Sequence, residues 1–187
     1  MSMTDELTDA FAASWELTAS VAIDCSAERV YEMVSDITRM GEWSPECRGG
    51  EWLSGPPGRA GSRFHGFNRE DEAEWTSECE VIAATPAREF GFTVLAFCAG
   101  RPGPDTQWVG GSQPGDQTWT FTIREDGSGC VLTQSHTMKL VGPFYRMLLE
   151  EVAENERLDN VRNRRNHLQH SMESTLAEIK KACEQHS

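Results

Sequence analysis

The sequence predicts an α+β fold in which a curved antiparallel sheet of seven strands wraps around one long C-terminal helix. The chain begins with an alternating strand pattern and changes at once to helical spacing. Several further strand-like segments follow, and roughly forty residues of helix-forming sequence close the chain. Because a curved sheet and a long helix enclose a space between them, we look for the function of the protein in that space.

The first strand and the helices after it are marked by a change of period. Apolar residues fall on the odd positions of 15–23, which predicts a strand with one buried face. Ser26 or Asp24 can then cap a helix over about 27–36. A second short helix is expected over about 38–42, before Pro45 ends it.

Six further segments alternate between apolar and polar residues and are separated by glycine and proline turns. These predicted strands are 50–54, 61–68, 74–84, 88–97, 117–124 and 129–139. The stretch 98–116 is too rich in proline and glycine to be regular strand, and it predicts a hairpin insertion around Trp108. Loops of this length are typical of functional lids or of disordered segments, and both interpretations remain open here.

The C-terminal helical sequence is predicted in two parts. Pro143 opens it at a position where proline is tolerated. The charged stretch that follows predicts a break or bend near Asn155, and 157–184 has the apolar stripe of a single helix.

Length and charge bound the organisation of the chain. We expect one domain over 15–187, preceded by a tail or short amphipathic turn over 1–14. The net charge of −13 argues against binding to nucleic acid. We expect no membrane insertion, because no apolar run approaches the roughly 20 residues of a span. Monomer and homodimer both remain open.

The sequence shows neither a signal segment nor closely spaced cysteine pairs, and these two observations bear on where the protein is located and on the state of its cysteines. Without a basic and then apolar signal segment, we expect a cytoplasmic protein. Its six cysteines form no C-x-x-C pair, and we expect them to be reduced, partly buried thiols. No cofactor or metal is predicted: His167 and His170 lie three apart on a helix, and two histidines at this spacing are more typical of solvated helix residues than of a metal site.

The candidate site residues are polar or aromatic groups on strand faces that are otherwise apolar. Gln134 and His136 share a face with Leu132 and Met138, so the histidine is expected to point inward and to act as a general acid or base. The alternative is a core histidine satisfied by a neighbouring carbonyl. Asn68 and Ser77 are further candidates. Aromatic side chains expected at the cavity walls are Trp43, Trp75, Phe92 and Trp119, although the same residues would also suit a plain core.

Three segments carry a family resemblance: 36–46 (DITRMGEWSPE), 61–68 (GSRFHGFN) and 172–180 (MESTLAEIK). With them, the chain resembles the polyketide cyclase/dehydrase-type members of the SRPBCC or START-like (birch-pollen-allergen-like) superfamily, in particular an actinobacterial branch. The resemblance covers about 15–97 and 117–183. It implies a helix-grip fold with seven strands, two small helices and a long C-terminal helix.

The resemblance implies less about function, because this fold serves aromatase/cyclases, lipid and sterol carriers and hormone receptors. In the aromatase/cyclases, a cavity arginine is thought to orient the polyketide and polarise its carbonyls. Arg63 lies on the corresponding strand and is the matching candidate, and alternation places it on the face opposite Phe64.

Together these features predict a protein that binds a hydrophobic, aromatic or polyketide-like small molecule in its cavity. If it is an enzyme, we expect cyclisation or dehydration without a metal, with His136 as acid or base and Asn68, Gln134 or Ser77 orienting carbonyls. The first alternative is a non-catalytic carrier or sensor of a lipid or quinone. The second is an interaction module whose acidic face binds a basic partner and whose cavity is a filled core.

Overall fold

The computed structural model describes residues 9–110 and 113–185. Seven strands are present: β1 (Trp15–Ile23), β2 (Cys47–Ser54), β3 (Arg63–Glu70), β4 (Ala73–Thr85), β5 (Glu89–Ala99), β6 (Gln117–Asp126) and β7 (Gly129–Met138). They form one antiparallel sheet in the order β1-β7-β6-β5-β4-β3-β2. The predicted α+β class and strand count are therefore confirmed.

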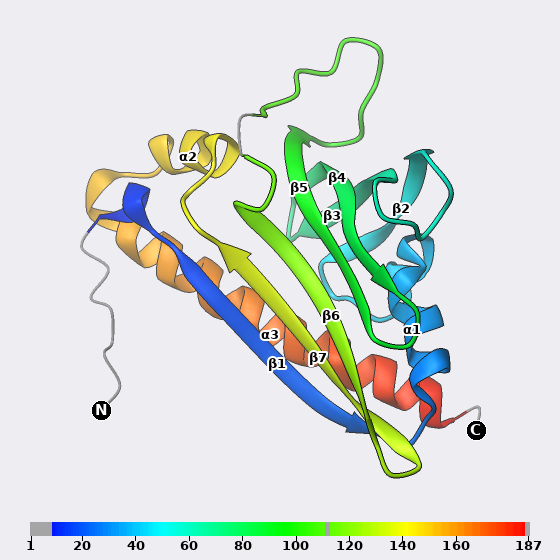
Figure 1. The fold of residues 1–187 in the computed structure, drawn as a ribbon. Helices are drawn as coiled ribbons and strands as arrows, with labels where there is room; N and C mark the ends of the chain where they lie inside the picture. Colours follow the sequence, from blue (N-terminus) through cyan, green and yellow to red (C-terminus); the bar gives the residue numbers. More distant parts are fainter. Residues whose placement is uncertain (1–8, 111–112, 186–187) are drawn as a thin grey trace.

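The helices of the described chain are α1 (Ala27–Ser35), α2 (Pro143–Glu150) and α3 (Arg157–Glu184), and the 3-10 turns are η1 (Ala10–Ala12), η2 (Ile37–Glu42) and η3 (Glu154–Glu156). Figure 1 shows α3 lying along one face of the sheet, as the helix-grip fold requires. None of these helices is long and apolar enough to cross a lipid bilayer.

Local chemistry explains where the helices begin and end. The Ser26 hydroxyl caps α1 by accepting a hydrogen bond from the Arg29 amide at 3.3 Å. The predicted break near Asn155 is confirmed, because η3 separates α2 from α3.

The start of β2 differs most from its prediction, because the strand begins at Cys47 rather than near residue 50. Gly49 and Gly50 carry no side chains from which alternation could be read, and Gly49 has a φ of +101°.

The segment before β1 packs on the domain in its described part. Residues 1–8 of the expected tail lie outside the described residues, but Ala10 and Ala13 are buried and η1 forms the short turn that was the other expectation. The Phe11 ring lies beneath two guanidinium groups, with the Arg146 carbon 4.6 Å and the Arg157 carbon 5.2 Å from its centroid. Residues 9–14 are thus held against the helical layer.

The C-terminal half of α3 closes over the core of the protein. Val30 of α1, Phe90 of β5, Leu132 of β7 and Ile179 of α3 are all fully buried there. A side chain of this size gains about 1.5–3 kcal/mol when it is fully buried, so this end is held by apolar packing.

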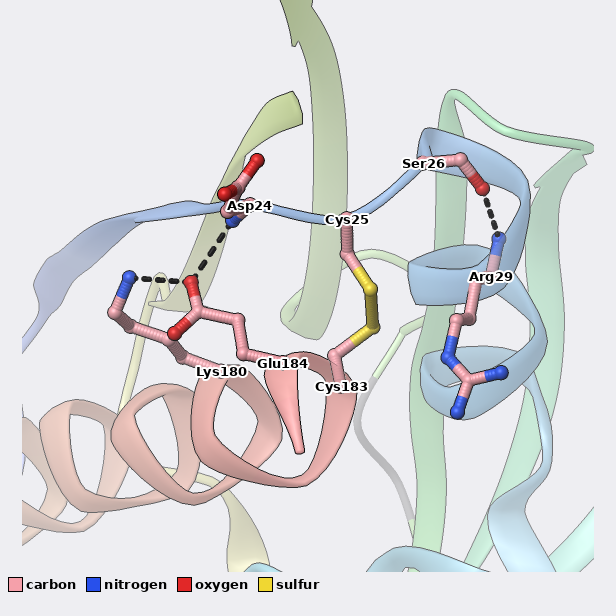
Figure 2. The surroundings of a disulfide bond; sticks show 7 residues. All are labelled: Asp24, Cys25, Ser26, Arg29, Lys180, Cys183 and Glu184. Carbon is pink, nitrogen blue, oxygen red and sulfur yellow. Dashed lines mark hydrogen bonds and ion pairs between the residues drawn. A yellow bond between two sulfur atoms is a disulfide. The ribbon is translucent and has the colours of Figure 1, made fainter. Parts of the chain in front are cut away.

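A disulfide joins Cys25 to Cys183 at this closed end, with their Cα atoms 6.4 Å apart (Figure 2). The expectation of six reduced thiols was therefore wrong for this pair. Cys25 lies in the link from β1 to α1 and Cys183 in the last turn of α3, 158 positions away, so sequence spacing did not reveal it. Beside it, the Asp24 amide donates to the Glu184 carboxylate at 2.9 Å.

The insertion between β5 and β6 packs on the outer face of the sheet. Its Val109 exchanges backbone hydrogen bonds with Phe97, and Trp108 stacks on His65 with ring centroids 5.0 Å apart. His65 alternates with Phe64 along β3 and faces away from α3. Residues 111–112 lie outside the described chain, and the described part of 100–116 contributes nothing to the space beneath the sheet. The lid interpretation therefore finds no support in the described residues.

Candidate functional site

A cavity of about 840 Å³ lies between the sheet and the N-terminal half of α3. The inner faces of all seven strands contribute to one wall, and α2 and α3 form the other. The cavity reaches along α3 as far as Thr175, after which the packed core begins. This volume lies within the 300–1,000 Å³ typical of small-molecule sites.

Seven of the nine site residues predicted from the sequence line this cavity. They are Asn68, Trp75, Ser77, Phe92, Trp119, Gln134 and His136. Strand alternation places them there, because each lies on the inward face of its strand. Their roles toward a ligand remain predictions.

Arg63 does not line the cavity, and its assignment as a ligand-binding residue is corrected here. Its side chain lies on the outer face, where its Nε is 3.0 Å from Glu80 and an Nη is 3.4 Å from Glu78 on the neighbouring strand. Phe64, the next residue, takes the inward position. Arg63 therefore does not supply the cavity arginine that the resemblance to aromatase/cyclases implied.

Trp43 is also displaced from its predicted place. It is buried, but it ends η2, and its indole Nε1 donates to the Met40 sulfur at 3.1 Å rather than facing the cavity. Its position after a short turn, outside any strand, made its direction unreadable from alternation.

His136 is the most deeply buried polar group of the cavity wall, at 1% exposure. Its ring stacks on Trp119 with centroids 3.9 Å apart, and its Nδ1 lies 2.9 Å from the Thr118 carbonyl oxygen. Burial lowers the pKa of His136 to about 4, so the ring is neutral at pH 7. Since a carbonyl only accepts, Nδ1 carries the proton and Nε2 is a hydrogen-bond acceptor.

Asn68 and Ser77 are both tied to one backbone group. The Asn68 Nδ2 donates to the Gly66 carbonyl at 3.2 Å, and the Ser77 hydroxyl donates to the same oxygen at 3.3 Å. These bonds orient the two side chains on the cavity wall. They also commit the Ser77 proton, which leaves its oxygen as an acceptor toward a ligand.

An ion-pair cluster of Glu46, Glu70, Arg164 and His167 forms the polar side of the cavity. Arg164 binds Glu46 through both Nη atoms at 2.7 and 2.8 Å and Glu70 at 2.7 Å. His167, one turn along α3, places its two ring nitrogens 3.4 Å from the same two carboxylates. The cluster therefore joins α3 to the segment before β2 and to the end of β3.

The charges within the cluster set its protonation. Burial alone would raise the pKa of Glu46, but hydrogen bonds and charge from His167 and Arg164 outweigh it and lower the pKa to about 2. The hydrogen bond with Glu46 raises the pKa of His167. Glu46 is consequently ionised at neutral pH, and Arg164 is its main counter-charge.

Glu46, Glu70 and His167 bring three possible metal-ligand atoms within 4.8 Å of one another. The Arg164 guanidinium, however, already lies against both carboxylates, so a cation at this point would have to displace it. The His170 ring faces the Asn166 carbonyl at 2.8 Å instead, so the histidine pair does not converge.

The sequence did contain a signal for this cluster. The apolar stripe of α3 runs through Val161 and Leu168, and the inward position between them is Arg164. A charged residue inside such a stripe indicates a partner of opposite charge in the facing layer. The carboxylates were missed because they come from distant segments rather than from the helix itself.

Comparison with known proteins agrees with this architecture. The chain matches the family model described as polyketide cyclase/dehydrase and lipid transport over residues 14–169. The Polyketide_cyc-like protein Cgl2372 from Corynebacterium glutamicum is 27% identical, with 92% of this chain and 93% of that chain covered and a TM-score of 0.61. Comparison with curated protein sequences finds no match.

Two more distant structures show the same fold. The di-domain ARO/CYC StfQ of the steffimycin biosynthetic pathway is 13% identical, with 92% of this chain and 51% of that chain covered and a TM-score of 0.64. A START superfamily protein from Mycobacterium smegmatis is 14% identical, with 88% and 98% covered and a TM-score of 0.53. Because the family model spans more than half of the sequence, the chain belongs to the polyketide cyclase/dehydrase and lipid transport family.

Proposed function

We propose that the protein binds a flat, hydrophobic, aromatic or polyketide-like molecule in the cavity between the sheet and α3. The cavity of about 840 Å³ is the observation that carries this proposal. Aromatic side chains supply much of its wall, and they suit a flat apolar ligand. They are Trp15, Phe64, Trp75, Phe92, Phe97, Trp119, Phe121, Phe144 and Tyr145. A cavity of this size argues against the alternative of a filled core.

Ligand binding is tested by filling the cavity from the helix side. Pyrene, a flat apolar fluorescent probe, is titrated into the wild type, Ser171→Trp and Ser174→Trp. Ser171 lines the cavity, whereas Ser174 lies on the exposed face of the same helix. We expect Ser171→Trp to weaken pyrene binding at least about 10-fold and Ser174→Trp to leave it unchanged. Equal binding by all three proteins, or no binding by the wild type, would contradict the proposal.

Native mass spectrometry of the purified protein supplies a second measurement. A co-purified small molecule would be carried by the wild type and by Ser174→Trp but not by Ser171→Trp. Its mass would then give the chemical class of the ligand directly.

A second candidate function is metal-free cyclisation or dehydration of the bound molecule. His136 favours it, because a neutral ring with a free Nε2 inside a cavity can accept a proton. With a pKa of about 4 the ring cannot serve as a general acid at pH 7, so the predicted acid role is narrowed to that of base or acceptor. Gln134 and Asn68 would orient carbonyl or hydroxyl groups.

The two functions predict different behaviour of one variant. If the protein is an enzyme, His136→Ala removes turnover of a cyclisable polyketide while ligand affinity stays within a few-fold. If it is a carrier, neither the wild type nor the variant converts the ligand, and the variant loses only the affinity due to packing.

A further inference from the structure

The exposed residues of the cavity lining show where the cavity opens to solvent. They include Ala73 and Glu74 at the start of β4 and Asn163 and His167 on α3. An opening therefore lies between α3 and the hairpin of β3 and β4, and we call it the cavity mouth.

The ion-pair cluster of Glu46, Glu70, Arg164 and His167 crosses this mouth. Glu70 ends β3, directly before the turn to β4, while Arg164 and His167 belong to α3. The exposed fraction of the side chains rises from 11% for Glu46 through 22% for Arg164 and 32% for Glu70 to 42% for His167. The cluster thus runs from the buried wall to the solvent, and His167 is its outermost member.

The His167 ring lies against two carboxylates at once. Its Nε2 is 3.4 Å from Glu46 and its Nδ1 is 3.4 Å from Glu70. A neutral imidazole has one N–H, so its other nitrogen would face a carboxylate with an unshared electron pair, and only the protonated ring can donate to both. The charges agree, because the two carboxylates share the single guanidinium of Arg164, and a protonated His167 supplies the second positive charge.

The groups that face the ring favour its protonated form. The hydrogen bond with Glu46 and the negative charges of Glu70 and Glu46 raise the pKa of His167, and they outweigh burial and the charge of Arg164. On the α2 side, burial raises the pKa of Tyr145 to about 12, so its hydroxyl stays neutral. The ring is therefore protonated at pH 6 and loses its proton as the pH rises through its raised pKa.

We propose that His167 is a pH-dependent latch on the cavity mouth, which holds the mouth closed when the ring is protonated and loosens it when the ring is neutral. The protonated ring joins α3 to the segment before β2 and to the end of β3. Arg164 keeps its bonds in both states, so the mouth is loosened rather than lost. This inference rests on the proposed function, because it concerns how the molecule held in the same cavity is exchanged.

The test measures the rate of pyrene release at pH 6 and at pH 9. Protein loaded with pyrene is mixed with an excess of phosphatidylcholine vesicles, and the recovery of tryptophan emission reports release. EDTA is present throughout, so that a metal ion does not contribute. We expect the wild type to release pyrene about 5-fold faster at pH 9, which corresponds to the loss of one partly exposed ion pair.

Three variants identify the group that is responsible. His167→Gln should release pyrene at the fast rate at both pH values, and His167→Lys, which stays charged, should release it slowly at both. His170→Gln is the matched control and should behave as the wild type, because the His170 ring faces the Asn166 carbonyl at 2.8 Å on the same helix.

A titration of the histidine ring signals by NMR gives a readout that needs no ligand. We expect the midpoint of His167 to lie above 6.5 in the wild type and to fall in Glu70→Gln, which removes one of the two carboxylates. A wild-type midpoint below 6.5 would show that the ring does not bridge the carboxylates, and it would overturn the latch.

The release experiment also distinguishes the latch from the function on which it rests. Equal release rates of the wild type at pH 6 and pH 9, or a pH dependence that persists in His167→Gln, would overturn the latch but leave the cavity as a ligand site. Failure of the wild type to bind pyrene at either pH would overturn both proposals.

Discussion

The two ends of the space between α3 and the sheet are built from the same elements but hold different contents. Near Cys183, Leu132 and Ile179 meet the helix α1 in a fully packed core. Toward the start of α3, this long helix and the sheet enclose a cavity lined by aromatic and polar side chains. The fold therefore provides the space, and the side chains decide whether it becomes core or cavity.

The contacts that hold α3 to the rest of the protein also differ between its two ends. Its C-terminal end is tied by the disulfide and by the bond from Asp24 to Glu184 (Figure 2). Its N-terminal half is tied across the cavity by Arg164 to Glu46 and Glu70. The helix is held by a covalent bond at the end where it packs against the sheet, and by an ion-pair cluster at the end where a cavity separates it from the sheet.

Removing the disulfide should have the largest effect. Because the bond spans 158 residues, loss of chain-entropy restraint predicts a decrease of about 5 kcal/mol in the free energy of unfolding. Urea denaturation of wild type with and without a phosphine reductant, beside Cys25→Ala/Cys183→Ala, measures it. The reductant should leave the double variant unchanged. Alkylation of all six cysteines in unreduced, unfolded protein would contradict the bond, since the structure leaves four free.

Breaking the ion-pair cluster should have the next largest effect. Arg164→Met leaves Glu46 buried without its main partner and should cost about 3–5 kcal/mol in the free energy of unfolding. Arg162→Met is the matched control on the same helix. Arg162 pairs with the exposed Asp159 at 3.0 Å, so this substitution should cost less than about 1 kcal/mol. Similar losses in both variants would show that the cluster does not fasten the helix.

The pH dependence of stability reports on the cavity wall. Folding lowers the pKa of His136 from 6.5 to about 4, so its contribution is present above pH 6.5 and is lost as pH falls through 4. Between pH 7 and pH 4 the wild type should lose about 3 kcal/mol relative to His136→Asn, which cannot titrate. Parallel pH curves for the two proteins would show that the ring is not buried in its neutral form.

A matched pair of leucines measures the difference in packing directly. Leu176 and Leu168 are both buried on α3, but only Leu168 borders the cavity. Leu176→Ala should cost about 2–5 kcal/mol, and Leu168→Ala about 2 kcal/mol less, because the leucine beside a cavity has fewer neighbours to lose. Equal costs would mean that the cavity wall is packed like the core.

Most of the fold could be predicted from the sequence because it depends on local patterns. Alternation along β7 placed Gln134 and His136 inward, and the charge run before α3 located the break at Asn155. The same rule set Arg63 and Phe64 on opposite faces, yet only the packed structure shows which face is inside.

The rest of the site depends on contacts between distant segments. Glu46 and Arg164 are 118 positions apart, and Cys25 and Cys183 are 158 apart, so no local period connects them. The volume of the cavity likewise depends on how far the layers stand apart, which no single strand records. For these reasons the sequence predicted a cavity but did not predict the ion-pair cluster beside it or the disulfide that holds the end of α3.

The contact of Trp108 with His65 has a consequence for how this protein can vary. Since the described part of the β5–β6 insertion rests on the outside of the sheet, its length and composition can change without altering the cavity walls. The molecule thus separates an outer surface that can diverge, or accept an engineered reporter, from the side chains that line the cavity.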